Sequence, residues 1–220
     1  MRAPAGLEGG MGSRWMAVVA TGLALTGCET LDKGQCLQGD WSAIGYADGV
    51  DGYPASRIND HGKACAQYGV APDARVYYAS RERGLPLYCT PARGFLAGRN
   101  GDSYKGVCPP PLERGFLAGF ADGGLVHDAQ ARVDHAESDR SSADSRRRRL
   151  DRDIRDEEAR MDDTKTTDEQ RRSIREHLRR LRDDRRRVDD DWRDASYARD
   201  AAERDLSMVR ARFTPIYGTW

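Results

Sequence analysis

The second half of the chain contains neither glycine nor proline from residue 125 to residue 214, and half of the residues from 125 onward are charged. Its 24 basic and 24 acidic side chains are interleaved, so opposite charges can pair three or four residues apart. Without helix breakers, this composition favours helix over a disordered chain. Apolar residues recur there at steps of three and four, with Arg185 and Arg199 completing the series: Ile174, Leu178, Leu181, Val188, Trp192, Ala195, Ala202, Leu206, Val209 and Phe213. This spacing predicts one long amphipathic helix.

A sparser series upstream predicts a second helix that packs against the first. Thr167 and Gln170 form a capping-box pattern, which predicts a new helix start there. Region 125–213 is therefore predicted to form an antiparallel helical hairpin, a coiled coil with helices over about 127–161 and 168–212. An alternative is that the first helix continues directly from the segment beginning near Pro111, with Gly123-Gly124 as a kink. Pro215 is expected to end the second helix and leave a tail, 214–220. The upstream series keeps a seven-residue repeat whose phase stops near residue 162: Ala136, Ala143, Leu150, Ile154 and Met161.

Charged residues interrupt the apolar series of the first hairpin helix. Arg140, Arg147 and Glu157 fall at core positions, where an unpaired charge is costly. The hairpin is therefore expected to be completed by a protein partner or by a second copy of the chain. The arginine run 146–149 does not predict a nucleic-acid partner, because acidic residues flank it and the whole chain has a formal net charge of zero.

The region 36–124 contains most of the glycines and four cysteines, at positions 36, 65, 89 and 108. Four cysteines in so short a segment are typical of two disulfides in an exported domain. A metal site is not predicted, because the gaps of 29, 24 and 19 residues contain no Cys-x-x-Cys pair. Three pairings are possible, and we predict Cys36 with Cys65 and Cys89 with Cys108, which close the shortest loops.

A degenerate pattern of an aromatic residue, a small residue and a glycine recurs through the same region. The hexapeptide Arg-Gly-Phe-Leu-Ala-Gly occurs twice, at 93–98 and 114–119. Small residues three or four apart on a helix let a second helix approach closely. The pattern predicts a small all-α domain of short glycine-rich helices. A groove for a ligand is an alternative, and a glycine-rich β repeat is disfavoured by the scarcity of β-branched residues.

The N-terminal residues 1–27 are typical of a secretory signal peptide. Arg2 and Arg14 supply positive charge before an apolar run that is too short to span a bilayer. Met11 is an alternative first residue of the translated chain. The run ends in Leu-Thr-Gly-Cys28, which resembles the bacterial lipobox and predicts a lipidated Cys28 carrying a diacylglyceryl group and an N-acyl chain such as palmitate. Glu29 in place of Asp favours the outer membrane. Residues 28–35 are predicted to form a tether.

Several blocks in the cysteine-rich region resemble a family of uncharacterised proteobacterial lipoproteins, the domain-of-unknown-function family 2799. The resemblance covers about residues 36–126, and Ser80 departs from it where the family usually has glycine. It implies a location and an architecture but no activity. The blocks that carry it include Gly39-Asp40-Trp41, Ile44-Gly45-Tyr46, Asp48-Gly49, Ala64-Cys65, Tyr88-Cys89-Thr90-Pro91, Gly94-Phe95 and Gly106-Val107-Cys108-Pro109.

Residues for catalysis are few. No nucleophile elbow or zinc-protease motif occurs, and no cofactor is predicted. His61 lies among the family-like blocks, and with Asp73 and Arg81 it is the candidate ligand site. The sequence thus favours a non-enzymatic, lipid-anchored envelope lipoprotein, facing the periplasm, whose hairpin contacts a protein partner or itself. The alternative is an enzyme or small-ligand binder with its site in region 36–124.

Overall fold

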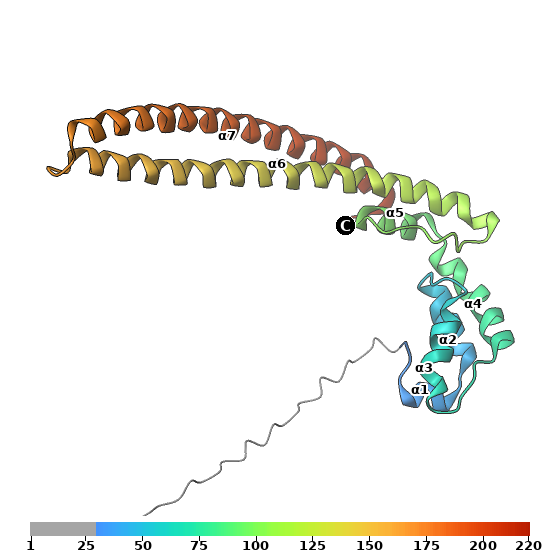
Figure 1. Ribbon diagram of the computed structural model, residues 1–220. Coiled ribbons are helices and arrows are strands. Elements are labelled where there is room, and N and C mark those ends of the chain that lie inside the picture. Colours follow the sequence, from blue (N-terminus) through green and yellow to red (C-terminus); the bar gives the residue numbers. More distant parts are fainter. Residues whose placement is uncertain (1–29) are drawn as a thin grey trace, which may run out of the picture.

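The computed structural model describes residues 30–220, and over these residues α-helix is the only regular secondary structure (Figure 1). The predicted signal peptide and Cys28 lie outside the described residues. The all-α prediction, with a small disulfide-linked domain followed by a long helical hairpin, is confirmed. The helices are α1 (Lys33–Gln38), α2 (Trp41–Val50), α3 (Arg57–Ala66), α4 (Ala74–Tyr88), α5 (Pro91–Asn100), α6 (Pro110–Asp162) and α7 (Asp168–Tyr217).

Glycines bring α2 and α4 into direct backbone contact. A Cβ atom added at Gly45 would lie 2.3 Å from the carbonyl oxygen of Tyr77, and one added at Gly84 would lie 2.3 Å from that of Tyr46. Both distances are far shorter than any carbon can approach an oxygen, so only glycine permits this packing. The predicted role of the small residues in close helix packing is confirmed here.

The pair α5 and α6 is built in the same way. Added Cβ atoms at Gly94 and Gly98 would lie 2.0 Å from the carbonyl oxygens of Phe116 and Phe120. On the facing helix, Gly119 meets the carbonyl oxygen of Pro91 at the same distance. The repeated hexapeptide supplies the glycines of both helices of this pair, which explains why it occurs twice.

Two disulfides link other segments of the glycine-rich region. Cys36 pairs with Cys65, which joins α1 to α3, and Cys89 pairs with Cys108, which joins the end of α4 to the segment before α6. This is the pairing predicted from loop length. The predicted tether is shorter than expected, because Leu31 is buried in a core cluster with Cys36 and Trp41, and α1 starts at Lys33. Residues 30–35 therefore belong to the folded domain.

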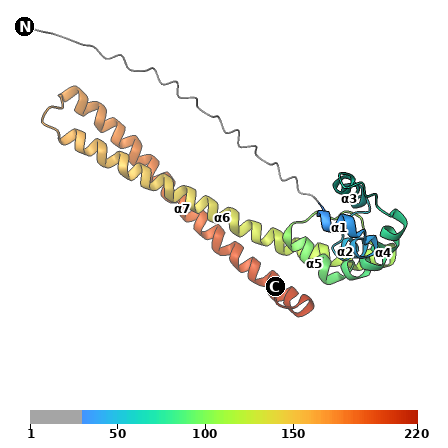
Figure 2. The ribbon, with the colours of Figure 1, turned by 90° about the horizontal axis from the view of Figure 1, so that it is seen from below.

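The hairpin helices extend further than predicted (Figure 2). α6 begins at Pro110 and runs through Gly123 and Gly124 without interruption, so the predicted boundary between residues 124 and 125 lies inside a helix. α7 continues past Pro215 to Tyr217, so Pro215 does not end it. Proline is tolerated in this last turn, since it removes only one backbone donor and the turn is still closed by the Gly218 N–H, which donates to the carbonyl oxygen of Thr214 at 2.9 Å.

We call α7 together with the part of α6 from residue 125 onward the arm. Acidic residues spaced seven or fourteen apart along one edge of α6 form ion pairs across the arm: Glu137 with Arg199 at 3.0 Å, Asp151 with Arg185 at 2.7 Å, and Glu158 with Arg182 at 2.7 Å. Spacing by heptads keeps these carboxylates on one edge, so the pairs favour this register of the two helices.

The charges expected to weaken the arm are paired within it. Arg147 lies 3.0 Å from Asp189, and Glu157, which is 9% exposed, lies 2.8 Å from Arg160 and 3.1 Å from His177. Arg140 pairs with Glu137 at 2.8 Å. An unpaired core charge was the reason to expect a partner for the arm. Because these charges are paired within the arm, they do not by themselves require a partner.

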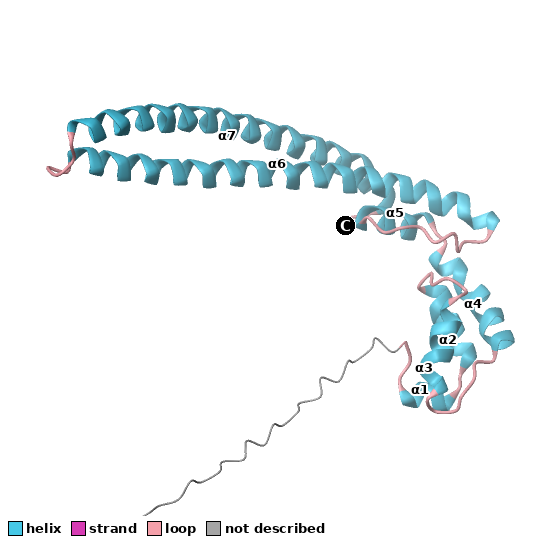
Figure 3. Cartoon of the chain, in the orientation of Figure 1, coloured by secondary structure: helices cyan, strands magenta, loops and turns pink. Residues whose placement is uncertain are grey.

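The aromatic end of α7 contacts α5 and so joins the arm to residues 30–124, which we call the N-terminal domain. The ring of Tyr217 stacks on that of Phe95 of α5 with centroids 4.2 Å apart, and Phe213 and Trp220 contact the same ring. The Tyr217 hydroxyl also donates to Asp122 of α6 at 2.7 Å. Three separate segments, α5, α6 and the end of α7, thus meet in one aromatic cluster. Figure 3 shows helices and loops, and no strand, over the described residues. Among these residues, no helix is both long enough and apolar enough to cross a bilayer.

This contact predicts a loss of stability at high pH. Burial, followed by the hydrogen bond to Asp122, raises the pKa of Tyr217 to about 12 from an ordinary value of 10.0. The folded state keeps the proton that the unfolded state releases, so the stabilisation is complete below pH 10 and is lost as the pH rises towards 12. Tyrosinate absorbance should therefore show a late-titrating tyrosine that disappears in Tyr217→Phe. Below pH 10 the variant should lose about 1 kcal/mol of stability. An unchanged titration curve would contradict the assignment.

Candidate functional site

The fold buries His61 of α3 between two polar side chains from distant segments. Its Nδ1 atom lies 2.8 Å from the hydroxyl of Thr30, and its Nε2 atom lies 2.8 Å from a carboxylate oxygen of Asp48 on α2. The imidazole is 2% exposed and Asp48 is 7% exposed. Because a carboxylate only accepts, Nε2–H donates to Asp48, and the Nδ1 atom of a neutral ring accepts from Thr30.

Tyr77 of α4 completes this buried cluster. Its hydroxyl donates to the same carboxylate oxygen of Asp48 at 2.5 Å, and its ring is fully buried. Burial, reinforced by the hydrogen bond and the negative charge of Asp48, raises the pKa of Tyr77 far above its ordinary value. The phenol therefore remains a donor at any physiological pH. We refer to Thr30, Asp48, His61 and Tyr77 as the buried polar cluster.

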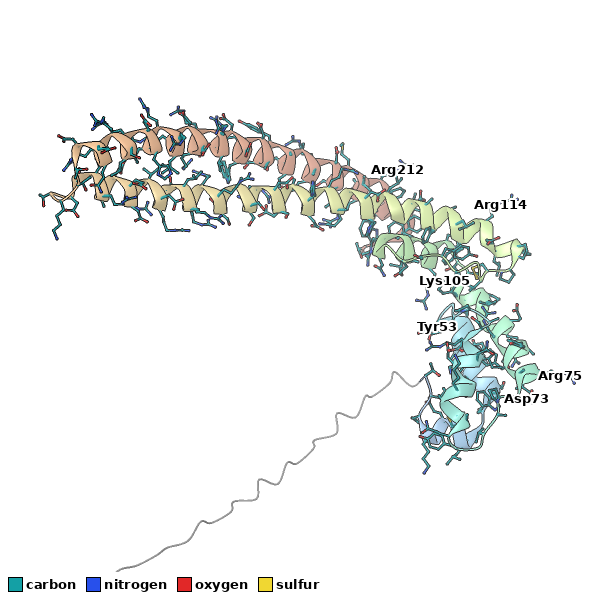
Figure 4. The ribbon with its side chains drawn as sticks, in the orientation of Figure 1. Tyr53, Asp73, Arg75, Lys105, Arg114 and Arg212 are labelled. Carbon is teal, nitrogen blue, oxygen red and sulfur yellow. A yellow bond between two sulfur atoms is a disulfide. The ribbon has the colours of Figure 1, made fainter. Side chains whose placement is uncertain are left out.

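The other two predicted site residues do not join His61. Arg81 of α4 is buried, but its Nε and Nη2 atoms donate to the backbone carbonyl of Tyr53 at 2.9 and 2.7 Å. Asp73 is exposed and accepts from the backbone N–H of Val76, which caps the N-terminus of α4. Figure 4 shows Asp73 and Tyr53 on opposite sides of the N-terminal domain in this view. Among the described residues, no hydrogen bond or ion pair joins His61 to Asp73 or Arg81, so the structure does not bring the three predicted residues together as one hydrogen-bonded site.

Three members of the buried polar cluster were not predicted. Asp48 stands among apolar and small residues of α2, and a carboxylate in such a setting signals a buried partner. Tyr77 was interpreted as an aromatic packing residue, and Thr30 as part of the tether. Their contacts with His61 and Asp48 span 13 to 31 residues of sequence, which spacing rules within one helix do not reach.

The order of hydroxyl, imidazole and carboxylate is that of catalytic triads, but here the imidazole and the carboxylate are buried, and their contacts clamp α2, α3 and α4 together. Five surface hollows in the described part of the chain are lined by residues of α5, α6, α7 and the tail, and Thr30, Asp48 and His61 line none of these five. A catalytic hydroxyl needs space for a substrate beside it. The cluster instead joins α2, α3 and α4 to the segment that leads to the N-terminus.

Possible metal ligands are likewise dispersed. His127 faces the backbone carbonyl of Arg99 at 3.3 Å, and the exposed His135 lies 3.5 Å from Asp139. Within residues 30–220, no group of three or more histidine, cysteine or acidic side chains is close enough to hold a metal ion.

The family model described as protein of unknown function, DUF2799, matches residues 40–124. We therefore call residues 40–124, which are similar to this family, the DUF2799 domain. The match contains α2 to α5 and the glycine-packed start of α6, together with Asp48, His61 and Tyr77. It stops inside α6, so the arm lies beyond the matched region. No curated protein and no solved structure was found to match the chain.

The buried polar cluster predicts a specific loss of stability in the DUF2799 domain. Replacing Asp48 by asparagine turns one acceptor into a donor that faces the Tyr77 hydroxyl or the His61 N–H. We expect a loss of about 2 kcal/mol, since hydrogen bonds to a buried charged group contribute about this much. The matched control is Asp60→Asn on α3, whose exposed carboxylate lies 3.4 Å from Lys63 and which should change stability by less than about 0.5 kcal/mol. Urea unfolding followed by circular dichroism compares them, and equal effects would refute the clamp.

Proposed function

We propose that the protein is a lipid-anchored lipoprotein of the bacterial cell envelope with a structural or protein-interaction role and no enzymatic activity. In this proposal, acyl chains on Cys28 hold the DUF2799 domain at the outer membrane, and the arm contacts a partner in the periplasm. Multiple acyl chains anchor a protein stably where a single chain does not. The two disulfides are consistent with an oxidising compartment such as the periplasm.

The observation that carries the proposal is the short distance in sequence between the lipobox-like cysteine and the folded domain. Leu31 is buried and Thr30 is hydrogen-bonded to His61, so the fold begins two residues after Cys28. A flexible linker would let the domain move freely above the membrane. Here the linker is so short that a lipid on Cys28 would place the domain directly at the membrane surface.

Replacing Cys28 by serine in cells tests the anchor. We expect the wild-type chain to incorporate a clickable palmitate analogue and to sediment with the outer membrane, and the variant to lose both properties. Glu29→Asp is the matched control: it should keep the label and move to the inner membrane. A Cys28→Ser variant that still sediments with membranes would overturn the proposal.

A further inference from the structure

The arm carries equal and opposite net charges on its two halves. The distal half, residues 146–187, has 17 basic and 12 acidic side chains, for a formal net charge of +5. The proximal half, residues 125–145 and 188–213, has 7 basic and 12 acidic side chains, for a formal net charge of −5. The two net charges sum to zero, so the overall composition does not reveal that the two halves of the arm are oppositely charged.

One side of the proximal half is hollowed and largely apolar. A hollow of about 510 Å³ lies between α6 and α7, and alanines form most of its wall: Ala131, Ala136, Ala198, Ala201 and Ala202. An adjoining hollow of about 420 Å³ shares Asp139 and Ala198 with the first and adds Asp194 and the ion pair of Asp191 with Arg146 at 3.1 Å. We call this side of the arm the alanine face. Its small residues allow another helix to approach closely.

The alanine face continues into the distal half with the opposite charge. Arg187 and Arg180 lie seven and fourteen residues before Asp194, and Arg149 lies seven residues after Ser142, which lines the second hollow. Heptad spacing keeps them on the same side of the arm. Among the described residues, Arg149 and Arg180 have no carboxylate within 4 Å. Asp194 and Asp205 likewise have no lysine or arginine nitrogen within 4 Å. Unpaired charges of opposite sign therefore lie at the two ends of one face.

We propose that the arm associates with the arm of a second copy of this chain, antiparallel and through the alanine face. An antiparallel copy places the +5 half of each arm over the −5 half of the other, whereas a parallel copy opposes like charges. The two-fold symmetry makes both contacts identical, so the interface closes at two chains. This deepens the proposed function by naming the partner, and it rests on that proposal only for the membrane setting.

The shape of the molecule is compatible with two anchored copies. Figure 1 shows the arm extending to one side of α1–α4 rather than onward along the direction of α2 and α4. Two chains can therefore lie antiparallel, related by an axis across their arms, with both N-terminal domains on the same side of the pair. An arm that pointed straight away from the domain would place the two anchors at opposite ends of the dimer.

Exchanging charges between the halves tests both the association and its direction. The distal variant carries Arg149→Glu, Arg180→Glu and Arg187→Glu, and the proximal variant carries Asp139→Arg, Asp194→Arg and Asp205→Arg. All six side chains are exposed, so the fold should tolerate them. Sedimentation equilibrium of the full chain in density-matched detergent should show a dimer for the wild type and a dissociation constant raised at least about tenfold for each variant alone. A mixture of the two variants should dimerise again, because each half then meets its opposite charge.

Three outcomes would overturn the inference. One is a monomeric wild-type chain, and another is a mixture that associates no better than the separate variants. The third is a wild-type dimer that both variants leave intact. Raising the salt from about 50 mM to about 500 mM should weaken the wild-type dimer, because exposed charges are then screened within a few ångströms. None of these measurements depends on lipidation, so the anchor and the dimer can fail separately.

Discussion

Replacing Gly123 by alanine should destabilise the protein by about 3 kcal/mol or more, whereas the same change at the adjacent Gly124 should leave it equally stable or stabilise it slightly. A Cβ atom at Gly123 would lie 2.1 Å from the carbonyl oxygen of Phe95, a backbone atom that cannot move without separating α5 from α6. Forcing extra volume into such a contact costs a few kcal/mol. At Gly124 no atom lies within 4 Å of an added Cβ atom.

The adjacent position is a close control. Both glycines lie inside α6 with ordinary helical backbone, so alanine raises helix propensity equally at each, by about 1 kcal/mol. Their difference in unfolding free energy therefore measures the helix contact alone. Chemical denaturation of both variants gives this difference. Equal effects at the two positions would mean that α5 and α6 do not touch through their backbones.

Removing the Cys36–Cys65 disulfide should have an effect of similar size. The bridge closes a span of 29 residues, and the loss of chain entropy that it imposes on the unfolded state corresponds to about 3.5 kcal/mol. The variant Cys36→Ser/Cys65→Ser should lose this stability in the DUF2799 domain and keep the arm helical. Circular dichroism measures both, because most of the helix is in α6 and α7.

The second bridge provides the comparison. Cys89→Ser/Cys108→Ser removes a span of 19 residues, for a slightly smaller expected loss. Mass spectrometry of the exported wild-type chain should find no free thiol at these four positions. Four free thiols, or no change in stability in either variant, would contradict the role given to the bridges.

The parts of the fold that follow from local spacing could be predicted from the sequence. The apolar series from Ile174 to Phe213 and the capping box at Thr167 located α7, and both are features within one helix. The disulfide pairing followed from loop length. A helix start near Pro111 was only the alternative prediction, because Gly123 and Gly124 resemble helix breakers, whereas Gly123 is in fact a site where α5 contacts α6. That distinction depends on a neighbour outside the helix.

The candidate site could be predicted only at His61. Asp73 and Arg81 were grouped with it by proximity in sequence, but α4 places them two turns apart, and each is committed to a different backbone partner. The true partners of His61 come from α2 and from the segment before α1. A buried imidazole is satisfied by whichever polar groups the tertiary fold brings to it, and the sequence pattern does not contain that information.

Because α6 is a single uninterrupted helix, it can transmit a force from one end of the arm to the other. One end of this single helix is gripped by α5 through backbone contact at Gly94 and Gly98, and the other end reaches the turn at residues 163–167. Between the grip and that turn no proline breaks the helix to absorb bending. A sideways force on the turn is therefore delivered as torque to the crossing of α5 and α6, where the Cys89–Cys108 bridge resists it.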